Sequence, residues 1–159
     1  MLFRSFSIES HARSTGRDPA RTPMQWDASR FAGFSKTEPW LPVSRDYKTR
    51  NVAVESLNPT SMLHFYRQLI HFRNSSNILL RGSYRSIHTN SKKIFAYLRQ
   101  YAEKTLLIML NFSKDTIVEP IHTSTTIEIV CTTYMDRHPG EVIHSEIILR
   151  PYEGCVLRI

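Results

Sequence analysis

Residues 106–112 read Leu-Leu-Ile-Met-Leu-Asn-Phe, and this run decides the fold class. Leu106, Ile108, Leu110 and Phe112 recur with the period of two that places alternate side chains on one face of a β-strand. The same alternation appears at 94–98, 127–131 and 155–159. Turn-forming residues separate these runs, at Ala102-Glu103, 113–115, 138–140 and 152–154. From about residue 82 onward the sequence therefore predicts about six or seven short strands in an antiparallel sandwich or barrel.

One helix is expected immediately before the strands, over Ser61 to Arg73. Apolar residues recur there at steps of three and four, namely Met62, Phe65, Tyr66, Leu69, Ile70 and Phe72. Asn58-Pro59 fits an N-cap followed by proline at the first helical position. So broad an apolar face needs a large partner surface, and the residues before the helix cannot supply one.

Residues 1 to about 55 show no sustained helical or strand period and carry four of the prolines. A structureless stretch of this length is far longer than the usual connection inside a compact domain. Its aromatic residues, Trp26 and Trp40 among them, argue against disorder, since disordered segments are poor in aromatics. We therefore expect an ordered functional loop that belongs to something larger.

Composition excludes several classes of protein. Hydrophobic residues make up 41% of the chain, which is a globular proportion, and no apolar run reaches the roughly 18 residues of a membrane-spanning helix. The net charge is +7, but basic residues lie singly among acidic ones, and we expect no nucleic-acid partner. The amino terminus lacks the apolar core of a signal peptide. Cys131 and Cys155 lack metal-ligand spacing, and they are as readily two buried thiols as a disulfide.

No self-contained catalytic set, metal motif or cofactor motif is visible, and the seven histidines are scattered. The dense stretch is Gly16-Arg17-Asp18-Pro19-Ala20-Arg21-Thr22-Pro23-Met24-Gln25-Trp26-Asp27. An arginine can fork onto a carboxylate or onto paired hydroxyls, and an indole offers a flat face for a sugar ring. The competing interpretation is a tightly folded loop whose arginines make internal salt bridges.

The run from Arg17 to Asp27, continued by 32–35, 39–42 and 47–49, resembles the alpha-glucosidases of the alpha-amylase superfamily. It is similar to their maltase and oligo-1,6-glucosidase branch, with insect maltases the nearest variety. The helix from Ser61 to Arg73 then resembles the last helix of that family's (β/α)₈ barrel. Residues 107–113 and 149–154 look like two strand signatures of its C-terminal β domain.

This resemblance implies an α+β fold class, in which the last loop and helix of a TIM barrel precede an all-β antiparallel C-terminal domain. The division would be residues 1–80 for the end of the catalytic barrel and 81–159 for a β-sandwich. The family uses a carboxylate nucleophile and a carboxylic acid, both upstream of the arginine-rich loop. None of the motifs around them occurs here, so the resemblance implies a C-terminal fragment without catalytic residues that is inactive alone. The one residue that carries over is Arg21, which in the family reaches the floor of the first sugar pocket.

The expected parent is an alpha-glucosidase that hydrolyses terminal alpha-linked glucose from a small oligosaccharide of the maltose or sucrose type. It would need no cofactor or metal, and it would be secreted or membrane-associated. The alternative is a heavy-chain subunit of a heteromeric amino-acid transporter, whose partner would be a membrane transporter light chain. An intact Arg-Thr-Pro-Met-Gln-Trp run at 21–26 favours the enzyme. An independent sugar-binding β module is a weaker third possibility, because the strands carry no row of tryptophans.

Overall fold

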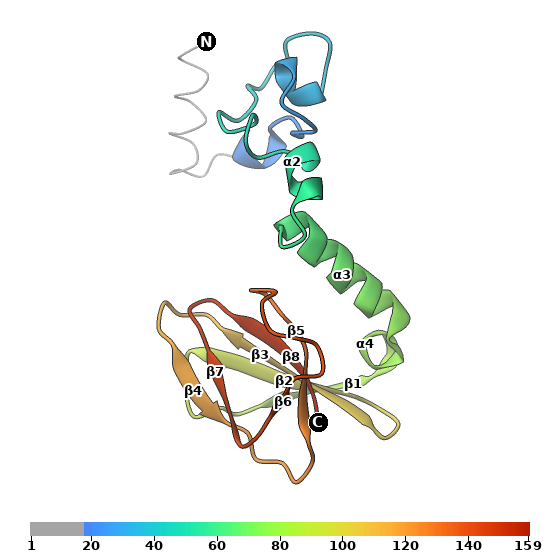
Figure 1. The fold of residues 1–159 in the computed structure, drawn as a ribbon, viewed down its shortest axis with the longest axis vertical. Helices are drawn as coiled ribbons and strands as arrows, with labels where there is room; N and C mark the ends of the chain where they lie inside the picture. The colour runs from blue at the N-terminus through green and yellow to red at the C-terminus, as the bar shows by residue number, and fades with distance from the viewer. Residues whose placement is uncertain (1–17) are drawn as a thin grey trace. The chain divides into compact units, whose positions relative to one another are not determined.

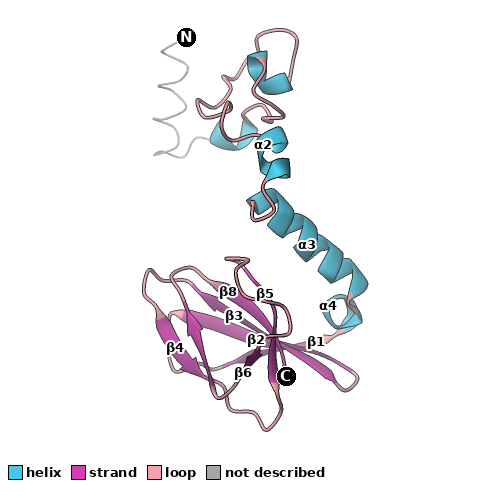
Figure 2. Cartoon of the chain, viewed as in Figure 1, coloured by secondary structure: helices cyan, strands magenta, loops and turns pink. Residues whose placement is uncertain are grey.

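The computed structural model describes residues 18–159, which form two compact units that divide between His64 and Phe65. Helices occupy the described chain as far as Arg81, and strands follow it (Figure 2). The order of elements matches the sequence-based expectation. The expected boundary between residues 80 and 81 is not tested by this division and stays a prediction.

The first unit contains short helical turns where the sequence predicted no regular structure. These are η1 (Asp18–Arg21), η2 (Arg30–Gly33) and α2 (Val52–Leu57), and all three lie in the blue to green part of the chain (Figure 1). Each has only four to six residues, too few to produce a periodic signal in the sequence. Loops connect them.

The expected helix is present as α3 (Met62–Ser75), but the N-cap predicted for it is wrong. Asn58 is the C-cap of α2 and not an N-cap, and its Oδ1 accepts a hydrogen bond from the Thr60 N–H at 3.0 Å. The Ser61 hydroxyl takes the capping role instead, since it accepts from the His64 N–H at 3.3 Å. Pro59 therefore lies in the turn between the two helices.

A further short helix, α4 (Asn77–Arg81), follows α3 and was not expected from the sequence. Ser76 is its N-cap and accepts a hydrogen bond from the Leu79 N–H at 3.4 Å. Arg99, from the adjoining sheet, closes the other end, since its Nη2 donates to the carbonyl oxygens of Leu79 at 3.1 Å and Gly82 at 2.8 Å. A cation at a helix C-terminus satisfies free carbonyls and complements the helix dipole.

The strands form a six-stranded and a two-stranded antiparallel sheet. In chain order the strands are β1 (Ser83–Ile87), β2 (Ile94–Tyr101), β3 (Lys104–Asn111), β4 (Ile117–Pro120), β5 (Ile127–Thr132), β6 (Val142–Ile143), β7 (Glu146–Leu149) and β8 (Gly154–Arg158). The larger sheet has the order β1-β2-β3-β8-β5-β6, and β4 pairs with β7 in the smaller one. The predicted turn at Ala102-Glu103 joins β2 to β3, and 113–115 separates β3 from β4.

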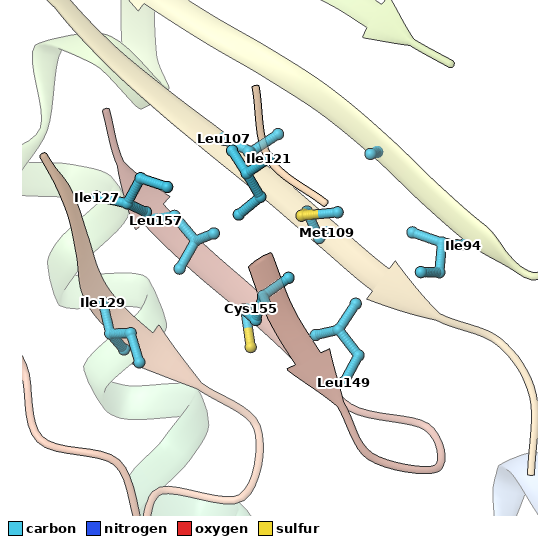
Figure 3. Close-up of a cluster of buried hydrophobic side chains, with 11 residues drawn as sticks. Ile94, Leu107, Met109, Ile121, Ile127, Ile129, Leu149, Cys155 and Leu157 are labelled. Carbon is cyan, nitrogen blue, oxygen red and sulfur yellow. The ribbon is translucent and has the colours of Figure 1, made fainter. Parts of the chain in front are cut away.

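The core lies between the two sheets and is built from alternate residues of several strands (Figure 3). Its buried members are Ile94, Ala96, Leu107, Met109, Ile121, Ile127, Ile129, Ile147, Leu149, Cys155 and Leu157. In β3 the core face is thus the one with Leu107 and Met109, and not the face with Leu106, Ile108 and Leu110 that the alternation singled out. Both faces of β3 are apolar, so the period alone could not choose between them, and Phe112 is exposed.

Candidate functional site

Arg21, the predicted sugar-contacting residue, lies at the end of η1 with an exposed side chain. Across residues 20–159, whose side chains are described, no hydrogen bond or ion pair involves Arg21. The salt-bridged interpretation of the arginines therefore finds no support at Arg21. Gly16 and Arg17, which belong to the same motif, lie outside the described residues.

The loop after Arg21 is attached to α2 through Gln25. The Gln25 side-chain amide donates to the carbonyl oxygen of Arg50 at 2.6 Å and to Asp46 Oδ1 at 3.3 Å. The backbone carbonyls of Gln25 and Trp26 in turn accept hydrogen bonds from the first N–H groups of α2, those of Val52 and Ala53, both at 3.0 Å. The loop thus fills the hydrogen-bonding positions that a helix N-terminus leaves open.

A buried asparagine completes this attachment. Asn51 is the N-cap of α2, and its Oδ1 accepts from the Val54 N–H at 2.9 Å while its amide donates to the Tyr47 carbonyl at 2.8 Å. Sequence reasoning missed this cap, although an asparagine before a short apolar run is a usual N-cap signal.

Asp27 binds its own turn, and no arginine among the described residues pairs with it. Its Oδ1 accepts from the Ser29 N–H at 2.8 Å and from the Ser29 hydroxyl. These hydrogen bonds from Ser29 hold the pKa of Asp27 below its ordinary value. The following residues Phe31, Ala32 and Gly33 all have positive φ, and a Cβ at Gly33 would lie 2.6 Å from Asp27 Oδ2. Glycine is therefore required at position 33.

Three large aromatic side chains of the first unit are exposed. Trp26 and Phe34 are each 51% exposed, and Trp40 is 72% exposed. Flat, accessible rings and an exposed guanidinium in one unit are groups that suit a ligand with both hydroxyl groups and apolar faces, such as a sugar. Over the described residues no group of three histidine, cysteine or acidic side chains is placed to hold a metal ion.

The most tightly organised charged cluster lies in the second unit, and sequence reasoning missed it. Glu153 is completely buried and accepts hydrogen bonds from Arg150 Nε at 3.0 Å, Arg150 Nη2 at 2.8 Å and Arg137 Nη2 at 3.2 Å. Asp136 accepts from the other edge of Arg150, at 2.6 and 2.7 Å. The Tyr134 ring lies 4.0 Å from the guanidinium carbon of Arg150.

Electrostatics agree with a structural role for this cluster. The hydrogen bonds from Arg150 lower the pKa of Asp136 to about 2. Burial on its own raises the pKa of Glu153, but the Arg150 hydrogen bonds and the Arg137 charge outweigh it and hold that pKa below its ordinary value. Both carboxylates are thus ionised at neutral pH, so neither can act as an acid catalyst there.

A cavity of about 410 Å³ lies between helices α3 and α4 and the face of the larger sheet that points away from the core. Phe65, Leu69 and Phe72 line it from α3, and Tyr97, Ile108 and Leu110 line it from β2 and β3. The β3 face that the sequence alternation singled out therefore meets this cavity. No helix among residues 18–159 is long and apolar enough to cross a membrane.

Comparison with known proteins places these features in a family. Residues 3–82 match the model of the alpha amylase catalytic domain. The oligo-1,6-glucosidase of Bacillus cereus is 39% identical over 148 residues, which is 91% of this chain and 26% of that protein. The glucan 1,6-alpha-glucosidase of Streptococcus pneumoniae is 40% identical over 68% of this chain and 20% of its own length.

Solved structures agree with the sequence relatives. The trehalulose synthase of Pseudomonas mesoacidophila superposes with a TM-score of 0.80 at 33% identity, over 90% of this chain and 26% of that one. An isomaltulose synthase from Klebsiella gives a TM-score of 0.80 at 25% identity, with the same coverage. The chain thus spans about a quarter of the length of the proteins that it matches.

These matches confirm the predicted fold class, a helical part of the alpha-amylase fold followed by an antiparallel C-terminal β domain. The predicted similarity to insect maltases is not tested by them and stays a prediction. The chain belongs to the alpha-amylase superfamily and, within it, to the alpha-glucosidase branch.

Proposed function

We propose that the chain forms part of an alpha-glucosidase that releases terminal alpha-linked glucose from small oligosaccharides. The observation that carries this proposal is the 39% identity to an oligo-1,6-glucosidase across 91% of the chain, including the loop that begins at Arg21. Nothing among the relatives reported above supports the transporter-subunit alternative.

In this function Arg21 binds substrate and takes no part in bond cleavage. Its exposed guanidinium has hydrogen-bond donors to offer, and the loop behind it is fixed to α2 through Gln25 and Asn51. A guanidinium held by a rigid loop binds the paired hydroxyls of a terminal glucose in a defined orientation. That arrangement closes a pocket behind one sugar unit and suits cleavage at the end of a chain.

The proposed substrates include more than one type of glycosidic linkage. Maltose-type and sucrose-type oligosaccharides are the substrates expected from the sequence, while the names of two relatives point to 1,6-linked glucosides. We propose an oligosaccharide with a terminal alpha-linked glucose, and the linkage preference is part of the test.

A chimera tests the function directly. In the Bacillus cereus oligo-1,6-glucosidase, the segment that matches this chain is replaced by residues 1–159, and hydrolysis of maltose, sucrose and isomaltose is measured. The chimera is expected to hydrolyse at least one of them, while the 159-residue chain alone is inactive. A folded chimera without activity on any of the three contradicts the proposal.

Arg21 is tested in the same chimera. Arg21→Ala is expected to lower kcat/KM by roughly 10- to 100-fold, as for the loss of a hydrogen bond from a charged group. The matched control is Lys36→Ala, which removes an exposed cation from the same unit and leaves kcat/KM unchanged. Equal effects of the two substitutions refute the role of Arg21.

A further inference from the structure

The two-stranded sheet continues beyond its last ladder pair into a pair of histidines. Strands β4 and β7 lie beside each other (Figure 1), and past their ladder the Ile121 N–H still donates to the Ser145 carbonyl oxygen at 2.7 Å. The next residues on the two segments, His122 and His144, are therefore opposite each other. Because the pair before them is hydrogen-bonded, they form a non-hydrogen-bonded pair, in which the Cβ atoms of an antiparallel ladder are about 4.5–5.5 Å apart.

Both histidines belong to the outer face of this sheet. Side chains alternate along a strand, and in β7 Ile147 is buried while Ile148 is 49% exposed. His144 precedes Ile148 by an even number of residues and shares its face. His122 follows Val118, which is 52% exposed, by the same number on the other strand. Both histidines are exposed as this alternation requires, and both line one hollow of about 500 Å³.

The two rings have no competing partners. Among the described residues neither imidazole has a hydrogen bond or an ion pair. Besides the histidines, the hollow is lined by hydroxyl-bearing and aliphatic side chains, and no lysine or arginine of the described chain lines it. Glu146, on the same face as His144, is exposed and adds a negative charge near the pair. A cation therefore meets two free ring nitrogens and no lysine or arginine in this hollow.

We propose that His122 and His144 form a binding site for a divalent transition-metal ion that prefers imidazole, such as Cu²⁺ or Zn²⁺. Each neutral imidazole supplies one ring nitrogen, and water molecules complete the coordination. Two protein ligands are fewer than a structural zinc site uses, so the ion is exchangeable. This site goes beyond the proposed function and does not depend on it, because neither histidine takes part in binding or cleaving the sugar.

The opposed arrangement is what distinguishes this pair from an ordinary exposed histidine. Once one ring binds the ion, the second is already held within reach, so its binding is intramolecular and has a high effective concentration. The bound ion also links the residues after β4 to those before β7. Since it binds the folded chain and not separated strands, it stabilises the fold.

The test is a calorimetric titration of the untagged 159-residue chain with CuCl₂ and, separately, with ZnCl₂, in a buffer that does not bind metals. His122→Ala and His144→Ala are each expected to weaken the Cu²⁺ Kd at least tenfold, because each leaves a single imidazole. The matched control is His138→Ala, which removes an exposed imidazole between β5 and β6 and leaves the Kd unchanged. His122→Gln and His144→Gln replace any alanine variant whose circular dichroism shows that it does not fold.

Electron paramagnetic resonance of the Cu²⁺-loaded chain tests the ligand set directly. The spectrum is expected to show coupling to two imidazole nitrogens, and to one in either single variant. The melting temperature should rise with Cu²⁺ in the parent chain and in His138→Ala, and not in the two site variants. Absence of saturable binding, equal effects of all three alanine substitutions, or coupling to only one nitrogen in the parent chain overturns the inference.

Discussion

The buried carboxylate of Glu153 accepts three hydrogen bonds from Arg150: from its backbone N–H at 2.8 Å, from Nε at 3.0 Å and from Nη2 at 2.8 Å. One arginine thus fixes both the backbone and the side chain of the turn that leads into β8. Because a buried charge is tolerated only when it is paired, the carboxylate of Glu153 depends on these hydrogen bonds from Arg150.

Replacing Glu153 by alanine is expected to destabilise the second unit by about 1–3 kcal/mol, since it removes the acceptor of hydrogen bonds from Arg150 and from the half-buried Arg137. Urea unfolding followed by far-ultraviolet circular dichroism measures the loss. Glu128→Ala is the control, because the Glu128–Arg158 pair lies on the surface and such pairs contribute about 0–1 kcal/mol. Equal losses for the two variants would show that burial is not what makes the Glu153 pair important.

Acid should weaken the same cluster. The folded-state pKa values of Glu153 and Asp136 lie below their ordinary values, that of Asp136 at about 2 against 3.8. A carboxylate whose pKa is lower in the folded than in the unfolded chain stabilises the fold at pH values above its unfolded-state pKa. This stabilisation is lost as the pH falls through the folded-state pKa. The free energy of unfolding should therefore fall between about pH 4 and pH 2. In Asp136→Asn the fall should be smaller, and an unchanged pH profile would contradict the assignment.

Gly33→Ala is expected to disturb the loop of the first unit and leave the sheets intact. The alanine Cβ would meet Asp27 at 2.6 Å in a left-handed backbone, a conformation that costs a non-glycine residue roughly 1–2 kcal/mol before any clash. Trp26 and Trp40 are the two tryptophans of the chain, and both lie in that unit. Their fluorescence should change while the circular dichroism of the sheets does not.

Gly140→Ala is the control for this substitution. Gly140 also has positive φ, but a Cβ there meets nothing within 4 Å and lies in the second unit. Tryptophan fluorescence should not respond to it. A response equal to that of Gly33→Ala would mean that the fluorescence does not report on the loop.

The two cysteines should remain unlinked and slow to react. Cys131 pairs with Val156 and Cys155 pairs with Thr132, so the two thiols point to opposite faces of the sheet. Burial raises the pKa of Cys131 to about 11 and that of Cys155 to about 12. Alkylation by iodoacetamide at pH 8 should be about 100-fold slower than in urea, because the thiolate reacts. Fast labelling of the folded chain, or an intramolecular disulfide by mass spectrometry, would refute this.

The second unit should resist proteases longer than the first. Leu106, Leu107 and Met109 of β3 are buried on both faces of the sheet, whereas the first unit has few buried apolar side chains. Backbone amides of β3 are expected to exchange with deuterium far more slowly than those of the Arg21–Asp27 loop. Equal protection of the two segments would show that the loop is as stable as the sheet.

Sequence periodicity predicted the helix and the strands that are long enough to repeat their apolar pattern several times. It gave the helix over Ser61–Arg73, which is α3 at Met62–Ser75, and the antiparallel strands after residue 82. Periodicity and capping signals failed where one sequence pattern is compatible with two different structures. Because β3 is apolar on both faces, alternation could not identify Leu107 and Met109 as its core residues. Asn58-Pro59 resembles a helix start, yet the same pair ends α2.

The charged and polar contacts could not be predicted in this way. Glu153 meets Arg137 across 16 positions of sequence, and Gln25 meets Arg50 across 25. Such pairs depend on how the chain folds back and leave no local pattern. Arg21 was identified by family resemblance alone, and the structure adds that its side chain is exposed on a loop fixed by Gln25.

The contact of Arg99 with the carbonyl oxygens of Leu79 and Gly82 limits where evolution or an engineer can divide this chain. A recombination breakpoint between Gly82 and Ser83 would pass the sheet to a new upstream neighbour and leave the Arg99 guanidinium without its two acceptors. A breakpoint before Asn77 keeps them. The sheet is therefore inherited together with α4, and a domain library built from this family should carry that short helix with it.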